Sequence, residues 1–210
     1  MSDLGEQLRL WADELRAIAG EGLYYDPDHP YHPARYRRVR RIAAELFAVQ
    51  SGEEALAVES SFATTALRTT PVSGADGAVF DGAGRILLIQ RADTGLWAMP
   101  GGALDVGETP AEGAAREVRE ETGLDVQPRA FVGVYDSRRC GSVLAFHLYH
   151  FVFLCDPVDP KNEPRSRHET TDVGWFQERD LPPLHGGHPI RVRDAFARHR
   201  GQITDAYFDR

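Results

Sequence analysis

One segment, residues 102–124, constrains this chain more than any other because its glycine, charged and aliphatic residues recur at fixed spacings. It reads G-ALDVG-E-TPAEGAA-RE-V-R-EE-T-G-L. A glycine opens it, Glu108 follows after five residues, Arg116 and Glu117 follow after seven more, and Gly123 with a leucine closes it. A pattern with this many specified positions is far more specific than an isolated glycine motif. We therefore treat the segment as one structural unit whose side chains act together.

The same segment carries the signals of a helix with both ends marked. Thr109 is a good N-cap, Pro110 suits the first helical position, and Glu112 occupies the place of a capping-box carboxylate. Gly123 suits the left-handed position just beyond a helix end. These signals predict a helix of roughly three to four turns near residues 110–122.

Three glutamates lie on one face of that predicted helix. Glu117, Glu120 and Glu121 stand at i, i+3 and i+4, so their carboxylates are neighbours. Mg2+ prefers oxygen ligands and is commonly shared between carboxylates and phosphates, which gives such a cluster a purpose. Arg116 lies four residues from Glu120 and is placed to tether it. We interpret the cluster as a metal site; a charged, solvated helix surface is the alternative.

Composition narrows the class of protein. The chain has 210 residues, of which 42% are hydrophobic and 27% charged, which is typical of a globular protein with a sizeable core. Its net charge of -8 argues against a general nucleic-acid binder. Its two cysteines show no metal-binding spacing. Without a signal peptide or a long apolar run, we expect a cytoplasmic protein that does not contact a membrane.

The first part of the chain predicts a small helical domain, residues 1–66. An apolar stripe of five residues steps by three and four, and Gly20 and Gly22 are expected to end that helix. A second helix is expected after Pro33, and a third, shorter one before Thr69. The basic stretch 35–41 fits a solvated face, a contact with phosphate or a partner subunit, or a nucleic-acid contact. The stripe consists of Leu4, Leu8, Trp11, Leu15 and Ile18.

In the remainder, residues 67–210, the spacing of apolar residues changes from a helical period to one typical of β-strands. Strands are predicted at 72–80, 85–90, 126–135, 143–155 and 172–176, and a closing helix at 189–199. Strands and helices follow one another in irregular order, which favours a mixed sheet between helices over a strictly alternating arrangement. The predicted fold class is α/β.

With these motifs in place, residues 70–200 resemble a Nudix hydrolase, whose signature Gx5Ex7REUxEExGU (U aliphatic) is filled at every specified position. The resemblance implies an α/β/α sandwich and hydrolysis of a nucleoside diphosphate linked to a group X, with Mg2+ or Mn2+. It implies that Glu117, Glu120, Glu121 and the carbonyl of Gly101 bind the metal. It also implies that Arg116 pairs with Glu108 to hold loop and helix together.

The helical N-terminal region is similar to that of a Nudix subgroup that includes CDP-choline pyrophosphatases and ADP-ribose-type hydrolases, commonly homodimers. The similarity rests on Trp11, residues 15–19, residues 22–25, residues 35–36 and residues 42–45. Members often carry Trp-Ala-Asp after the two glycines, where this chain has Ala-Leu-Asp at residues 103–105. For that reason the sequence assigns no particular X.

The hypothesis for the mechanism is that metal ions bridge the diphosphate and position a water for attack on phosphorus. A carboxylate near the water is expected to act as general base. Glu120 and Glu121 are candidates within the cluster, and Glu169, in a polar loop, is the rival outside it. The alternative for Glu169 is a loop carboxylate in solvent.

Substrate contacts are expected from three further residues, Tyr135, Arg138 and Arg139. The tyrosine is a candidate for stacking on a base, and the two arginines for contacting phosphate. Aromatic residues are also ordinary core residues, and arginines are ordinary in exposed turns.

Two other functions fit parts of the pattern. One is hydrolysis of oxidised nucleoside triphosphates, which releases pyrophosphate. The other is a regulator that binds a nucleotide without cleaving it, although such a regulator is expected to lack the metal glutamates. A role at the 5' ends of RNA is disfavoured by the acidic balance. The leading prediction is an NDP-X diphosphatase.

Overall fold

The computed structural model describes residues 3–64, 71–105, 107–142, 147–167 and 170–210. The chain divides into two compact units: the first runs to Val72 and also includes His147, and the second begins at Ser73 and resumes at Leu148. The predicted domain boundary at 66/67 lies outside the described residues. Each unit has its own hydrophobic core, so each is described by itself.

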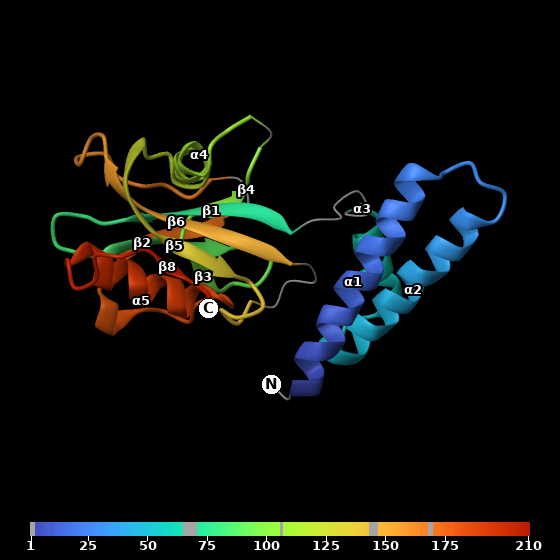
Figure 1. The fold of residues 1–210 in the computed structure, drawn as a ribbon. Helices are drawn as coiled ribbons and strands as arrows, with labels where there is room; N and C mark the ends of the chain where they lie inside the picture. The colour runs from blue at the N-terminus through green and yellow to red at the C-terminus, as the bar shows by residue number, and fades with distance from the viewer. Residues whose placement is uncertain (1–2, 65–70, 106, 143–146, 168–169) are drawn as a thin grey trace. The chain divides into compact units, whose positions relative to one another are not determined.

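The N-terminal unit is a set of three helices, α1 (Asp3–Tyr25), α2 (His32–Ser51) and α3 (Ala55–Thr64) (Figure 1). Pro33 lies in the first turn of α2, and Gly52, at a φ of +78°, ends that helix. The three helices enclose a core in which the Phe47 and Phe62 rings meet edge to face, an arrangement that aromatic pairs prefer, with centroids 6.1 Å apart. The remaining buried members of this core are Ala12, Ala43, Ala44 and Val58.

The prediction that Gly20 and Gly22 end the first helix is wrong. The helix continues to Tyr25, and Gly22 lies where α1 packs against α2. A Cβ at Gly22 would meet the Tyr36 ring at 2.2 Å. Glycine has a low helix propensity, but at position 22 its lack of a side chain leaves the space that the Tyr36 ring occupies.

The predicted apolar stripe of α1 is present but does not form the core of the unit. Leu4, Trp11 and Ile18 are 63%, 46% and 54% exposed, whereas the small residues Ala12 and Ala19 are fully buried. Of the stripe, Leu15 packs against the core of the unit, whereas Leu4, Trp11 and Ile18 lie on the outer face of the helix. No helix among the described residues is long and apolar enough to cross a membrane.

The C-terminal unit contains two sheets with helices on both sides (Figure 1). The larger has the strand order β4-β1-β6-β5-β8, in which β5 and β8 run parallel, and the smaller has the order β3-β2-β7. The strands are β1 (Val72–Val79), β2 (Ile86–Arg91), β3 (Trp97–Ala98), β4 (Gly101–Ala103), β5 (Val126–Asp136), β6 (Leu148–Pro157), β7 (Thr170–Phe176) and β8 (Tyr207–Phe208).

Two helices cover the faces of this unit. Helix α4 (Pro110–Thr122) packs through Val118 with Val79, Leu87 and Cys155, and α5 (His188–His199) packs through Val192 and its neighbours on the other core cluster. The arrangement is the mixed-sheet α/β/α sandwich that the sequence predicted. Both cysteines are free and buried, so neither takes part in a disulfide.

The short strands β3, β4 and β8 were not predicted, because two or three residues carry no usable period. One of them positions the site. Antiparallel pairing of β1 with β4 places Asp76 opposite Gly101 and Ala75 opposite Gly102. Gly101 and Gly102 are thereby fixed beside β1, at the edge of the larger sheet.

Candidate active site

Helix α4 begins and ends where its capping residues predict. The Thr109 hydroxyl accepts the Glu112 N–H at 3.3 Å, and the Glu112 carboxylate accepts the Thr109 N–H at 2.8 Å. At the other end Gly123 has a φ of +75° and donates its N–H to the Arg119 carbonyl. These bonds are local in sequence, which is why the sequence alone located this helix.

Arg116 holds the loop that precedes α4 against the helix. Its Nε and Nη2 donate to the two Glu108 carboxylate oxygens at 3.0 and 2.7 Å, and Nη2 also donates to the Ala103 carbonyl. These charge-assisted bonds, with the Asp105 N–H, lower the pKa of Glu108 to about 2. The implied pairing of Arg116 with Glu108 is confirmed, and it makes Arg116 a positioning residue.

The other terminal nitrogen of Arg116 reaches the glutamates. Nη1 donates to Glu117 at 2.8 Å and to Glu120 at 3.1 Å. The Glu117 side chain is only 14% exposed, and burial raises its pKa despite the nearby guanidinium. Glu120 is 48% exposed and points to the rim of the cluster. One arginine therefore orients a buried and an exposed carboxylate together.

Glu117 lies against the second glycine of β4. A Cβ built on Gly102 would meet its Oε1 at 2.5 Å, so a glycine is required there for the carboxylate to occupy this position. Gly101 is equally crowded, because a Cβ there would meet Asp76 Oδ1 at 2.4 Å. The two glycines let carboxylates approach the strand backbone from both sides.

Glu121 is the most strongly perturbed carboxylate of the cluster. It accepts the Gly101 N–H at 3.0 Å, which lowers its pKa, but burial and, to a lesser degree, the charges of Glu117 and Asp76 outweigh that bond and raise the pKa to about 7. A buried carboxylate among other carboxylates is a place where a divalent cation would be favourable.

The donor set fits Mg2+ or Mn2+, because Glu117 and Glu121 are partly buried, mutually repelling oxygen donors and Glu121 accepts the Gly101 N–H. Among the described residues, the motif glutamates do not form a group of three whose ligand atoms lie within 4.8 Å of one another. Glu117 and Glu120 accept hydrogen bonds from Arg116, and Glu121 accepts one from Gly101. Their side chains therefore have to rotate before all three could bind one ion.

A buried ion pair lies behind the glycine turn. Arg191 of α5, 1% exposed, donates to Asp76 Oδ2 and, through Nε, to the Gly187 carbonyl. His150 approaches the same carboxylate at 3.7 Å, and burial lowers its pKa to about 4, so it is neutral near pH 7. Asp76 and Arg191 could not be paired from the sequence, because nothing in the local pattern joins strand β1 to helix α5.

A cavity of about 370 Å3 opens beside Glu121 and is lined by Ile89, Arg91, Ala92 and Asp93. The Arg91 guanidinium donates to both oxygens of Asp93, at 3.0 and 2.6 Å. Arg91 was not among the predicted site residues; it is the last residue of the apolar strand β2. An arginine that follows a buried strand is a signal that could have found it, since strand ends commonly carry polar functional groups.

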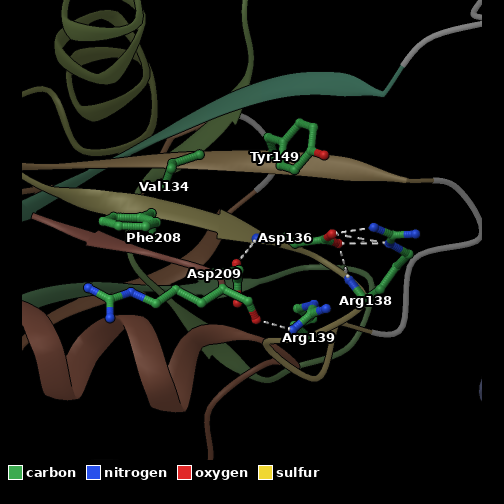
Figure 2. A pocket seen from close by; sticks show the side chains of 8 residues that line it. Val134, Asp136, Arg138, Arg139, Tyr149, Phe208 and Asp209 are labelled. Atoms are coloured by element: carbon green, nitrogen blue, oxygen red, sulfur yellow. Dashed lines mark hydrogen bonds and ion pairs between the residues drawn. The ribbon is translucent and has the colours of Figure 1, made fainter.

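A second cavity, of about 280 Å3, lies among β5, β6 and β8 and includes Arg138 and Arg139 (Figure 2). Figure 2 shows Arg138 folded onto Asp136, to which its Nε donates at 3.0 Å. Arg139 donates to the Arg210 carbonyl at 2.8 Å. This cavity shares no lining residue with the one beside Glu121, and β8 and β4 are opposite edges of the sheet. The structure does not bring these arginines to the glutamates.

The expectation that Tyr135 stacks on a base is wrong for this structure. Its side chain is fully buried in the core, stacked on Tyr207, and its hydroxyl donates to Asp194 at 3.1 Å. It lies on the α5 side of the sheet, because residues along a strand alternate in direction. The rival general base, Glu169, lies outside the described residues.

Comparison with known proteins agrees with this geometry. Residues 70–196 match the NUDIX domain model, and residues 6–62 match a model described as a UDP-X-like, N-terminal oligomerisation domain. YjhB of Bacillus subtilis (strain 168), to which ADP-ribose pyrophosphatase activity is ascribed, is 32% identical over 174 residues, 82% of each chain.

Solved structures show the same fold. An ADP-ribose pyrophosphatase from Streptococcus suis is 30% identical, with a TM-score of 0.58 over 67% of this chain and all of that one. A UDP-X diphosphatase superposes with a TM-score of 0.59 over 96% of this chain and 98% of its own, at 22% identity, and so supports the fold alone.

A diphosphate-cleaving hydrolase is the class that the sandwich and its glutamate helix define. The chain belongs to the Nudix family and is one of its pyrophosphohydrolases.

Proposed function

We propose that the chain is a metal-dependent hydrolase that cleaves the diphosphate of a nucleoside diphosphate linked to X, with ADP-ribose the first compound to test. The observation that carries the proposal is the pair of partly buried carboxylates, Glu117 and Glu121, of which Glu121 accepts the Gly101 N–H and lines the cavity that contains Arg91. The ADP-ribose pyrophosphatases of Streptococcus suis and Methanocaldococcus jannaschii, 30% and 31% identical, support this choice. CDP-choline is the alternative X compound.

In the proposed reaction a water attacks one phosphorus, the P–O bond of the bridging oxygen breaks, and the products are a nucleoside monophosphate and phospho-X. Mg2+ or Mn2+, when bound, neutralises phosphate charge and makes the water more acidic. Glu117 and Glu121, with the Gly101 carbonyl, would hold the cation, while Arg116 fixes the geometry of Glu117 and Glu120. Arg91 would contact a phosphate oxygen.

The proton of the attacking water would be taken by a carboxylate. Glu120, at the exposed rim, is our first candidate because it can turn from Arg116 toward bulk water. Glu121 and Glu169 are the other two candidates for this role. Contacts from Arg138 and Arg139 to the far end of an extended substrate stay a prediction.

The proposal is tested by incubating purified protein with Mg2+ or Mn2+ and ADP-ribose, CDP-choline, NADH, dinucleoside polyphosphates or 8-oxo-dGTP, with products separated by chromatography. We expect the parent protein to form a nucleoside monophosphate from one diphosphate compound. In Glu120→Gln we expect the rate of that reaction to fall by on the order of 100-fold or more, as for the loss of a general base. Release of pyrophosphate from 8-oxo-dGTP alone would favour the triphosphate function. No turnover with either metal would overturn the proposal in favour of a binding role.

We also propose that the chain forms a homodimer through the outer face of α1. Leu4, Trp11 and Ile18 leave apolar surface exposed along that helix, and the unit matches a domain described by its oligomerisation. Apolar side chains that recur on one face of a helix are commonly buried by a partner.

A further inference from the structure

A compact group of imidazole and carboxylate side chains occupies the turn between α1 and α2. The turn reads Asp-Pro-Asp-His-Pro-Tyr-His over residues 26–32. One ligand atom from each of Asp26, His29 and His32 lies within 4.8 Å of the others, the one such group found among the described residues. All three side chains are half-buried, and all belong to the N-terminal unit.

The contacts within this group are already close. His32 Nδ1 lies 2.6 Å from Asp26 Oδ2, and the His29 and His32 rings stack with centroids 3.4 Å apart at 7°. His29 Nδ1 accepts two long backbone bonds, from the Tyr31 and His32 N–H groups, each at 3.2 Å. An acceptor nitrogen carries a lone pair, and that is the form in which an imidazole binds a metal.

The geometry points to a second metal site here, formed by Asp26, His29 and His32, for a divalent transition ion of the Zn2+ class. Two imidazole nitrogens and one carboxylate oxygen suit Zn2+ or Co2+, whereas Mg2+ prefers an all-oxygen set. The turn therefore differs in chemistry from the glutamates of α4. Its remaining coordination positions would be filled by water.

Small movements bring the ligands to bonding distance. Zn–N bonds of about 2.0–2.1 Å in a tetrahedron separate two ligand atoms by about 3.3 Å. The Asp26–His32 contact at 2.6 Å has to open slightly, and any ligand pair near the 4.8 Å limit has to close by about 1.5 Å. The lone pairs of parallel rings do not converge, so the stack has to tilt. The long bonds to His29 Nδ1 would pass to water, as Tyr31 is exposed.

The position of the site assigns it a structural role. Asp26 directly follows the last residue of α1, and His32 is the first residue of α2. An ion shared between them would join the two helix ends and hold the hairpin turn. Because a metal that binds only the folded form adds its binding free energy to folding, the ion would stabilise the helical unit.

The test uses the full-length chain with Glu117, Glu120 and Glu121 all changed to Gln, so that the α4 site contributes no binding. The protein is dialysed against Zn2+ with Mg2+ in excess, and retained zinc is measured by atomic emission. We expect one zinc ion per chain, lost when His29→Ala and His32→Ala are added. His199→Ala, which removes an imidazole of the other unit, is the matched control and retains zinc.

Two further measurements keep the result interpretable. Helical circular dichroism checks that the double variant is folded; if it is not, Asp26→Asn, which keeps the size of the side chain and removes its charge, takes its place. In NMR spectra Zn2+ should shift the ring protons of His29 and His32, because the stack opens. Zinc retention that is equal with and without the two histidines, or absent altogether, overturns the inference. Neither outcome bears on diphosphate hydrolysis.

Discussion

At the scale of single residues, the ionisation of Glu121 couples the active site to the stability of the metal-free protein. Burial raises its pKa from 4.5 to about 7. Between these values the folded chain binds more protons than the unfolded chain, so the free energy of unfolding falls as pH rises through that window. The full shift corresponds to roughly 3 kcal/mol, an order-of-magnitude figure.

We therefore predict that Glu121→Gln is more stable than the parent protein at pH 8 in the presence of a chelator, and that the difference vanishes near pH 4.5. The amide keeps an oxygen that accepts the Gly101 N–H but carries no charge to bury. Chemical denaturation at several pH values measures this. Glu120→Gln, at an exposed position, is the control; a parallel pH dependence in the parent and Glu121→Gln would contradict the assignment.

Gly102 provides a second prediction at this scale. In Gly102→Ala the new methyl group would lie 2.5 Å from Glu117 Oε1, so the carboxylate has to move off the strand. A displacement of about 1 Å at a catalytic group costs on the order of 100-fold in rate, and we expect a loss of kcat of that size with weaker Mn2+ binding. Steady-state kinetics and calorimetry measure the two. Gly82→Ala, with nothing within 4 Å, should behave as the parent.

At the scale of elements, the packing of α1 on α2 depends on Gly22. Replacing a helical glycine by alanine ordinarily stabilises a helix by roughly 1 kcal/mol. Here we expect the opposite sign, because the added Cβ would meet the Tyr36 ring at 2.2 Å. Thermal unfolding of Gly22→Ala measures the effect. Adding Tyr36→Leu removes the ring and should restore stability; no restoration would mean that the ring is not the cause.

The elements differ in how far they could be predicted. Helix α4 was located because the bonds of its Thr109 cap and its Gly123 end join residues close in sequence. Strand β4 was not, because three residues become a strand only by pairing with β1, far along the chain. Gly22 was taken as a helix end, whereas its role is to leave room for Tyr36 of another helix, a contact that no local pattern contains.

At the scale of the whole molecule, the exposed face of α1 determines the predicted oligomer. Trp11→Glu with Ile18→Glu places two charges on that face, and burying unpaired charge in an interface is strongly unfavourable. We expect the parent to sediment as a dimer and this variant as a folded monomer. Val158→Glu changes an equally exposed apolar residue of the other unit and should leave the dimer intact. A dimeric double variant would exclude this face as the interface.

The sequence by itself determined the chemical identity of the site: a capped helix with Glu117, Glu120 and Glu121 on one face and Arg116 beside them. These relations span four residues or fewer, and helix geometry sets them without help from the rest of the chain. Only the tertiary structure decided which carboxylates are buried, that Tyr135 is core, and that Arg91 borders the site. Burial and cavities arise from strand pairing and packing between distant segments, whose energies no local pattern contains.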